Sequence, residues 1–297
     1  MLTISQILSP DTISQLNNLF LKAKFVVEGF IVGLHKSPYH GFSIEFSEHR
    51  AYGQGDEIKH IDWKLWGKTD KYFVKQFEEE TNLKSYLLFD QSASMKYKSD
   101  KISKLDYSKL IAASIGYLML KQQDAIGLTL FDNQIRYQIS PRSKKSHLYA
   151  ILSKLEQIKA GEETHIAPIL HKTAELIKKR GLIILISDLL DEPNKVLSGL
   201  KHFRHNGHEI IVFHILDPQE INLNYNNRTR FKDLESDDEV ITDPWHIKHD
   251  YKKSMEKFCD HYKTQCRKNK IDYVKLTTNT SLDVALNEYL LKRKKLN

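Results

Sequence analysis

The chain has 297 residues, of which 40% are hydrophobic and 28% charged, and its net charge is +7. This length and apolar content suffice for one large folded domain, or for one domain with an appendage. The composition excludes a disordered chain and a collagen, and two cysteines, Cys259 and Cys266, are too few for a disulfide framework.

The compartment follows from the same features. The first ten residues contain no Lys or Arg and no long apolar run, so we expect neither a signal peptide nor an anchor. Apolar runs such as Leu182–Ile186 are far too short to span a bilayer. Because so few cysteines favour a reducing compartment, we expect a cytoplasmic protein that does not insert into membranes.

The N-terminal part has two patterns. Apolar residues recur at three- and four-residue steps over residues 1–35, which predicts a helix. Residues 43–80 are irregular and rich in aromatic residues, and the alternation over 71–77 predicts one strand. We assign residues 1–82 to a small helix-and-strand region.

From residue 83 onward, strands alternate with helices. Strands are expected at 85–89, 125–131, 135–139, 182–186, 209–216 and 271–276, and helices at 105–122, 146–158, 166–179, 194–205, 244–269 and 281–292. This alternation predicts an α/β fold with a doubly wound, mostly parallel sheet over residues 83–297. The second and third strands flank an Asp132-Asn133 turn and are expected to form a hairpin. A polar insertion at about 218–243, for which a hairpin is one option, interrupts the pattern.

Polar side chains follow the strands where ligands collect in such sheets. Asp90, Ser92 and Ser94 follow the first strand, and Asp188 follows the strand at 182–186. Thr164 lies between them and opens a helix. Because the carboxyl ends of parallel strands form the binding crevice of these folds, we expect the five side chains to lie together.

These five residues form an all-oxygen set without His or Cys, which favours Mg²⁺ or Mn²⁺ over zinc. If the two carboxylates act mainly through water, the ion stays electron-poor and readily takes a carboxylate from another protein. Other interpretations are open. Asp90 and the serines could form a capped turn, Thr164 could be a helix N-cap, and Asp191 or Glu192 could replace Asp188.

The run Asp90-Gln-Ser92-Ala-Ser94, with its later Thr164 and Asp188, resembles the metal-ion-dependent adhesion site of von Willebrand factor A domains. The resemblance covers roughly residues 85–216. It implies a von Willebrand factor A-like fold and metal binding by these five residues.

A second run, Arg50-Ala-Tyr52-Gly-Gln-Gly55-Asp56-Glu-Ile-Lys59-His-Ile61-Asp62-Trp63, is similar to the hallmark of domain-of-unknown-function family fifty-eight. That family places the run about thirty residues before a von Willebrand-like domain, as here. Lys59 departs from the usual Arg and loses its bidentate fork, and Gly67-Lys68 departs as well. We interpret Arg50, Asp56, Asp62 and Trp63 as structural, a polar turn with an apolar anchor, with partner binding as the alternative.

The family resemblance implies proteins encoded beside MoxR-type AAA+ ATPases, with no established catalytic reaction. The sequence has no phosphate-binding loop, dinucleotide fingerprint or nucleophile elbow. We therefore expect a non-enzymatic, metal-dependent interaction protein, accessory to such an ATPase or bound to its client. A metal-dependent hydrolase of phosphate esters is the alternative, although Ser92 stands where such enzymes commonly need a second Asp. A nucleic-acid-binding protein is third, because residues 251–297 hold 12 basic against five acidic residues.

Overall fold

The structure is a computed structural model that describes residues 10–14, 16, 18–36, 49–51, 66–67, 73–75, 83–159, 161, 165–225, 227–232 and 239–296. Its central feature is a six-stranded sheet in the order β10-β7-β6-β3-β4-β5. The strands are β3 (Lys84–Asp90), β4 (Ala125–Phe131), β5 (Ile135–Arg142), β6 (Leu182–Ser187), β7 (Glu209–Leu216) and β10 (Asp272–Thr277).

Within this sheet, all neighbouring strands are parallel except β4 and β5, which form an antiparallel hairpin. Numbered in chain order, the strands follow the order 3-2-1-4-5-6 of doubly wound folds. The predicted fold class and the hairpin are therefore confirmed. The order reverses between β3 and β6, so the crevice at their carboxyl ends is the switch point of the sheet.

The central strands separate two cores. Leu87 and Phe89 of β3 enter one core, and Leu88, which points to the opposite face, enters the other. Every residue of β6 is buried, as its continuous apolar run predicts for a strand covered on both faces. The edge strand β5 instead alternates between half-buried and exposed residues.

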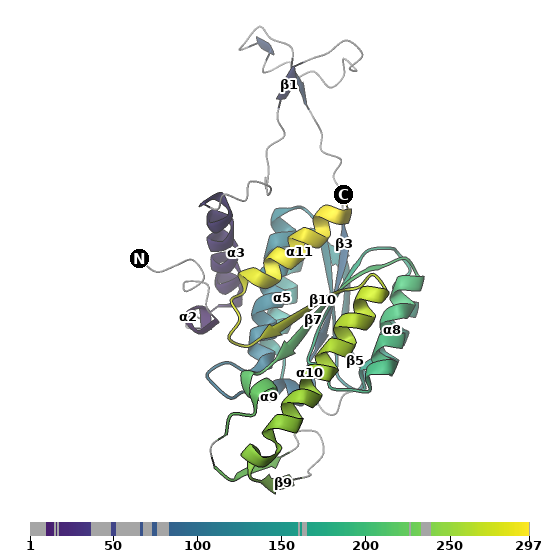
Figure 1. The fold of residues 1–297 in the computed structure, drawn as a ribbon. Helices are drawn as coiled ribbons and strands as arrows, with labels where there is room; N and C mark the ends of the chain where they lie inside the picture. Colours follow the sequence, from purple (N-terminus) through teal and green to yellow (C-terminus); the bar gives the residue numbers. More distant parts are fainter. Residues whose placement is uncertain are drawn as a thin grey trace.

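Helices cover both faces of the sheet (Figure 1). One face carries α2 (Pro10–Ser14), α3 (Leu19–Lys36), α5 (Lys104–Lys121), α6 (Lys145–Gln157) and α11 (Asp283–Leu296). The other face carries α7 (Ile166–Leu176), α8 (Pro193–His205) and α10 (Pro244–Lys268). Among the described helices, none combines the length and the apolar character that a membrane span requires.

The N-terminal helices belong to the larger core. Val26, Val27 and Phe30 of α3 are buried in the same cluster as Ile111 of α5. The backbone N–H of Leu19 donates to the Glu156 carboxylate of α6, at 2.9 Å. The helix expected over 1–35 is therefore two helices within the described residues, both packed on the sheet's own helical layer.

The family-like motif lies mostly outside the described residues. Its described part includes the strand β1 (His49–Ala51), which pairs antiparallel with β2 (Phe73–Lys75), so that Arg50 is opposite Val74. The strand expected at 71–77 is thus confirmed over its centre, whereas β1 falls in a stretch interpreted as irregular. The remaining motif residues, Tyr52, Gly55, Asp56, Asp62 and Trp63, lie outside the described residues, and so does the side chain of Arg50.

The insertion at 218–243 contains a short helix and a two-stranded ribbon. The helix α9 (Pro218–Asn222) was not expected, and the strands β8 (Thr229–Lys232) and β9 (Glu239–Thr242) form the hairpin proposed as one option. Asp217, directly after β7, caps α9 and forms a capping box with Glu220. The insertion therefore begins at the carboxyl edge of the sheet, the edge that holds the switch point.

Candidate metal centre

The two predicted carboxylates lie on adjoining strands at the switch point. Asp90 is the last residue of β3, Ser187 is the last residue of β6, and Asp188 follows it. The parallel register pairs Phe89 with Ile186, which brings the two strand ends together. Both carboxylate side chains are buried, with residue exposures of 0% for Asp90 and 1% for Asp188.

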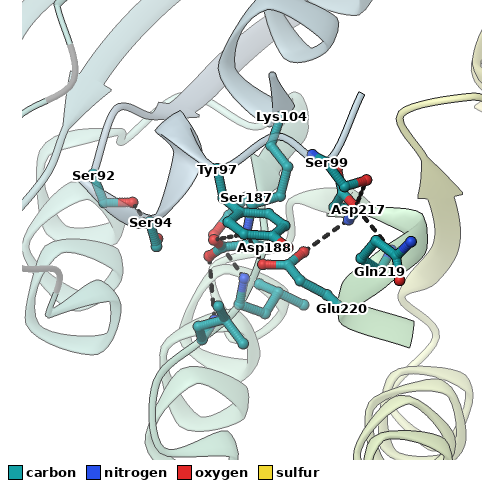
Figure 2. Close-up of polar contacts among 12 residues, drawn as sticks. Ser92, Ser94, Tyr97, Ser99, Lys104, Ser187, Asp188, Asp217, Gln219 and Glu220 are labelled. Atoms are coloured by element: carbon teal, nitrogen blue, oxygen red, sulfur yellow. Dashed lines mark hydrogen bonds and ion pairs between the residues drawn. The ribbon is translucent and has the colours of Figure 1, made fainter. Parts of the chain in front are cut away.

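Hydrogen bonds from Ser92 and Ser187 fix the Asp90 carboxylate. One carboxylate oxygen accepts from the Ser92 N–H at 2.9 Å, and the other accepts from the Ser187 hydroxyl at 2.6 Å. The hydroxyls of Ser92 and Ser94 lie 3.0 Å apart and point toward one another (Figure 2). Ser94 also bonds to Asp188 and lowers its pKa. Four of the five predicted ligands therefore come together.

The fifth predicted ligand, Thr164, lies outside the described residues. Asp191 and Glu192, the two alternatives to Asp188 as a ligand, have other partners. Asp191 accepts the N–H of Ile166 at 2.8 Å and so caps α7 from a distance, while Glu192 is paired with Lys195 on the surface. The capped-turn alternative holds in part, because Asp90 does accept a backbone N–H two residues ahead, as Asx turns do.

Lys104, which was not expected in the site, is its most buried cation. Its side chain is 0% exposed, and its ammonium donates to Asp188 at 2.8 Å and to Glu220 at 2.5 Å. The ammonium also lies 5.9 Å from the centre of the Tyr97 ring. Figure 2 shows Lys104 reaching between the carboxylates of Asp188 and Glu220. This lysine connects the strand end to α9.

The pKa values reflect this crowding of charge. Burial, and next the charge of Asp188, raise the pKa of Asp90 to about 7. Burial, the largest single influence, would also raise the pKa of Asp188, but the Lys104 ammonium and the hydrogen bonds that Asp188 accepts together outweigh it and hold the pKa below its ordinary value. Burial raises the pKa of Glu220 despite its contact with Lys104. Asp188 and Glu220 together outweigh the effect of burial on Lys104 and raise its pKa.

The cluster has more acid than base. When ionised, the buried carboxylates of Asp90 and Asp188 and the partly buried carboxylate of Glu220 carry three negative charges against the one positive charge of Lys104. Buried charge without a partner is unfavourable, so this surplus has to be protonated or neutralised by a cation. A divalent cation would offset much of this surplus, and the hydroxyls of Ser92 and Ser94 add neutral oxygen donors. The residues present therefore fit a hard divalent ion.

A second polar layer attaches α9 to the site. Asp217, also buried, accepts the N–H of Ser99 at 2.9 Å and its hydroxyl at 2.5 Å. The hydroxyls of Tyr97 and Tyr225 lie 2.5 Å apart, and Tyr251 donates to the Glu220 carbonyl at 2.7 Å. Sequence reasoning missed this layer, although the Asp217-Pro-Gln-Glu220 pattern matches a capping box and could have indicated the start of α9.

Comparison with known proteins gives one family and distant relatives. The family model described as "Protein of unknown function DUF58" matches residues 48–259. The chain is 25% identical over 217 residues to "Uncharacterized protein Rv1480" of Mycobacterium tuberculosis, which covers 72% of this chain and 68% of the relative. "Uncharacterized protein Mb1516" of Mycobacterium bovis matches with the same identity and coverage.

The chain is also similar, at low identity, to solved structures. The conserved hypothetical protein BatB from Bacteroides thetaiotaomicron is 14% identical, with a TM-score of 0.47 over 71% of this chain and 98% of that one. An aerotolerance-related membrane protein from Bacteroides fragilis is 15% identical, with a TM-score of 0.49 over 70% and 98%. The SpRpn10 VWA domain is 12% identical, with a TM-score of 0.42 over 69% and 93%.

Proposed function

The chain belongs to the family described as "Protein of unknown function DUF58", and we propose that it is a non-enzymatic, metal-dependent protein-interaction protein. Its site holds Mg²⁺ or Mn²⁺ through Asp90, Ser92, Ser94, Thr164 and Asp188. The last coordination position takes a carboxylate from a partner, a MoxR-type AAA+ ATPase or a client of that ATPase. In this proposal the protein acts in the cytoplasm, in the assembly or remodelling of other proteins.

The observation that carries the proposal is the surplus of buried acid at the switch point. Asp90 and Asp188 are held side by side although their charges repel, which is the first cause after burial of the raised Asp90 pKa. Such a pair of buried carboxylates lowers the stability of the fold unless a cation neutralises their charges. Perturbed carboxylates in a sheet crevice are typical of functional sites rather than of structural cores.

The remaining donors determine how the site treats a partner. When bound, the ion supplies one electron-poor coordination position. The hydroxyls of Ser92 and Ser94 are neutral and leave the charge of the ion largely unreduced. Lys104 engages one oxygen of Asp188, so this carboxylate neutralises less of any added positive charge. Both features reduce the negative charge that the protein ligands place on the ion, so its open position can take a carboxylate.

Metal binding can be tested by thermal unfolding. Mg²⁺ or Mn²⁺ should raise the melting temperature, because a ligand that binds only the folded state stabilises it by about 2.7 kcal/mol at 100 times its Kd. Asp90→Ala combined with Ser92→Ala should abolish the rise. The matched control, Ser153→Ala with Asp260→Ala, changes exposed residues of the same types and should respond like the parent. An equal response of all three proteins would place the metal elsewhere.

The hydrolase alternative predicts turnover where our proposal predicts none. We expect no phosphatase, nuclease or nucleotidase activity above background with Mg²⁺ or Mn²⁺. Activity that is present in the parent and lost in Asp90→Asn would assign the site to catalysis and end the interaction proposal.

The nucleic-acid alternative rests on the basic C-terminal segment, and several of its charges are already engaged. Lys292 pairs with Glu209 and Asp272, and Arg293 pairs with Asp124. These two cations therefore serve the fold. Any binding of DNA or RNA should be weak and should decrease steeply with salt, as phosphate contacts do.

The partner can be tested with the MoxR-type ATPase encoded nearest to the gene of this protein. The purified pair should form a complex in gel filtration with Mg²⁺ that dissociates in chelator. Ser94→Ala should lose the complex while keeping its circular dichroism spectrum. A complex that persists in chelator, and forms equally with Ser94→Ala, would separate the ATPase from the metal site.

A further inference from the structure

The insertion exposes large apolar side chains close together in the chain. Val240 and Ile241 of β9 are 61% and 57% exposed, and Trp245, in the first turn of α10, is 73% exposed. Single exposed apolar residues are ordinary on protein surfaces. These three lie within six consecutive residues, and we call them the ribbon surface. Large apolar side chains exposed in so short a stretch point to an interaction site.

The ribbon itself is not covered within the described structure. The β8–β9 sheet has two strands, and the first three residues of β9 are exposed. Because successive residues of a strand point to opposite faces, exposure of both Val240 and Ile241 means that both faces of β9 are open. A two-stranded ribbon is marginal on its own, and its free edge can pair with an added strand.

A chain of contacts joins the ribbon to the metal centre. Tyr97 closes the turn that contains Ser94, and its hydroxyl meets that of Tyr225. The Tyr225 ring packs edge-on against Phe231 of β8, at 5.5 Å between ring centres, and Phe231 is the cross-strand partner of Val240. Figure 1 shows β9, α9 and the start of α10 at one end of the molecule.

Charged residues are distributed unevenly along the ribbon. Near the end where β9 passes into α10, Arg228 and Lys248 provide two positive charges against the one of Asp243, while Arg230 is paired with Glu239. The connection between the two strands, residues 233–238, is acidic in sequence, with four Asp and Glu. An acidic group of a bound segment is therefore favoured at the end of the ribbon next to α10.

We propose that the ribbon surface and the metal centre bind one and the same partner segment. The segment is extended, and it carries an acidic residue that reaches the ion and large aliphatic or aromatic residues that cover Val240, Ile241 and Trp245. The free edge of β9 can add backbone hydrogen bonds to such a segment. This inference rests on the proposed function and specifies the chemistry of its partner.

The probe is a random library of 12-residue peptides displayed on phage and selected on the whole protein in Mg²⁺. Selected peptides are synthesised with a fluorescent label, and their affinities are measured by fluorescence anisotropy. The test variant carries Val240→Ser, Ile241→Ser and Trp245→Ser. The matched control carries Leu176→Ser and Leu291→Ser, which are exposed to 53% and 44% in α7 and α11.

We expect the selected peptides to combine Asp or Glu with Leu, Ile, Phe or Trp. Their affinity should fall at least tenfold in the triple variant, in chelator and in Ser94→Ala, and stay within twofold in the control. Peptides that need Mg²⁺ but bind the triple variant as well as the parent would overturn this inference and leave the proposed function intact. Peptides indifferent to chelator and to Ser94→Ala would overturn both.

Self-association is the competing use of the ribbon. Light scattering of the parent and the triple variant distinguishes it, and we expect both to be equally monomeric at micromolar concentration. A parent dimer that becomes monomeric in the triple variant would show that a second copy of this chain, rather than a partner segment, covers the ribbon surface.

Discussion

The metal centre and the ribbon surface depart from the ordinary burial of side chains in opposite directions. The metal centre buries charge, because Asp90, Lys104 and Asp188 are at most 1% exposed. The ribbon surface exposes apolar groups, led by Trp245. Folding alone favours neither arrangement, since buried charge is costly and exposed apolar surface gains nothing from the hydrophobic effect. Such violations of the local rules are expected at functional sites.

The two regions also differ in how firmly the surrounding strands hold them. Asp90 and Asp188 stand at the ends of the central strands β3 and β6. Each of these strands is hydrogen-bonded to a neighbour on both sides, so the sheet holds the two residues rigidly in place. The ribbon has two strands, and no other described strand pairs with it. A rigid centre suits the strict geometry of metal coordination, whereas a less constrained ribbon suits contacts that adapt to a partner.

The largest loss of stability should come from replacing Lys104, the buried cation of the site. Lys104→Met leaves Asp188 and Glu220 without their shared partner, and breaking a buried ion pair in this way costs about 3–5 kcal/mol. The free energy of unfolding should be measured by urea denaturation at pH 7.5 in chelator. Mg²⁺ should restore more stability to the variant than it adds to the parent, because ion and lysine neutralise the same carboxylate.

The matched control for that prediction is Lys121→Met, the same change at the exposed end of α5. It removes a cation from the last turn of the helix and should cost less than about 1 kcal/mol. A loss below about 1 kcal/mol in Lys104→Met as well would mean that the buried charges are not balanced as the distances indicate.

A smaller effect should appear as a pH dependence. The pKa of Asp90 is raised from 3.8 to about 7, so folded protein keeps this proton where unfolded chain has lost it. The unfolded state then binds fewer protons, so the Asp90 contribution to stability falls as pH rises from about 4 to 7, by about 1.4 kcal/mol for each unit of pKa difference. His214, whose pKa burial lowers to about 4, contributes in the opposite direction, and the comparison with an Asp90 variant separates the two. The lowered pKa of Asp188 acts below this window. Unfolding in chelator at pH 5 and pH 8 measures the fall.

Asp90→Asn and Mg²⁺ provide the two controls for this dependence. The asparagine variant should lose the fall between pH 5 and pH 8, and saturating Mg²⁺ should flatten it in the parent, because the ion holds Asp90 ionised. A parent whose stability rises over the same window, with the variant following it, would contradict the assignment to Asp90.

These effects separate what the sequence could predict from what it could not. Asp90, Ser92 and Ser94 were predictable because they are adjacent in sequence and follow an apolar run that ends at the crevice. Asp188 was predictable for the same reason. The doubly wound sheet follows from strands such as β6, whose unbroken apolar run requires cover on both faces.

Lys104 and Glu220 were not predictable in the same way. A lysine in the first turn of a helix and a glutamate in a capping box have ordinary exposed roles, and their burial depends on how α5 and α9 meet. Only tertiary structure brings their charges to 2.5 Å. The exposure of Trp245 was equally hidden, because an aromatic residue near a helix start is as compatible with a core contact as with a binding surface.

The hydrogen bond between Tyr97 and Tyr225 connects the two regions, and removing one oxygen atom should weaken this connection. Tyr225→Phe removes the hydroxyl that meets Tyr97, and should cost about 1 kcal/mol. Hydrogen exchange should accelerate in β8 and β9, because the ribbon loses its bond to the turn of the metal centre. Tyr149→Phe, on the exposed side of α6, is the control and should leave exchange in the ribbon unchanged. Unchanged exchange in Tyr225→Phe would show that the ribbon is held by other contacts.

The smallest effect on stability should come from the ribbon surface itself. The triple change Val240→Ser, Ile241→Ser and Trp245→Ser removes large apolar groups that already contact water, so little buried area is lost. The lower strand propensity of serine can loosen the ribbon, yet local opening there leaves global unfolding nearly unaffected. Urea denaturation should show a change within about 0.5 kcal/mol per site. By contrast, Ile211→Ser and Val212→Ser, at fully buried positions of strand β7, should together cost several kcal/mol, on the order of 2–5 for each large core side chain. A loss above about 2 kcal/mol in the triple variant would mean that the ribbon surface is covered within the folded chain, and the case for a docked partner segment would fail with it.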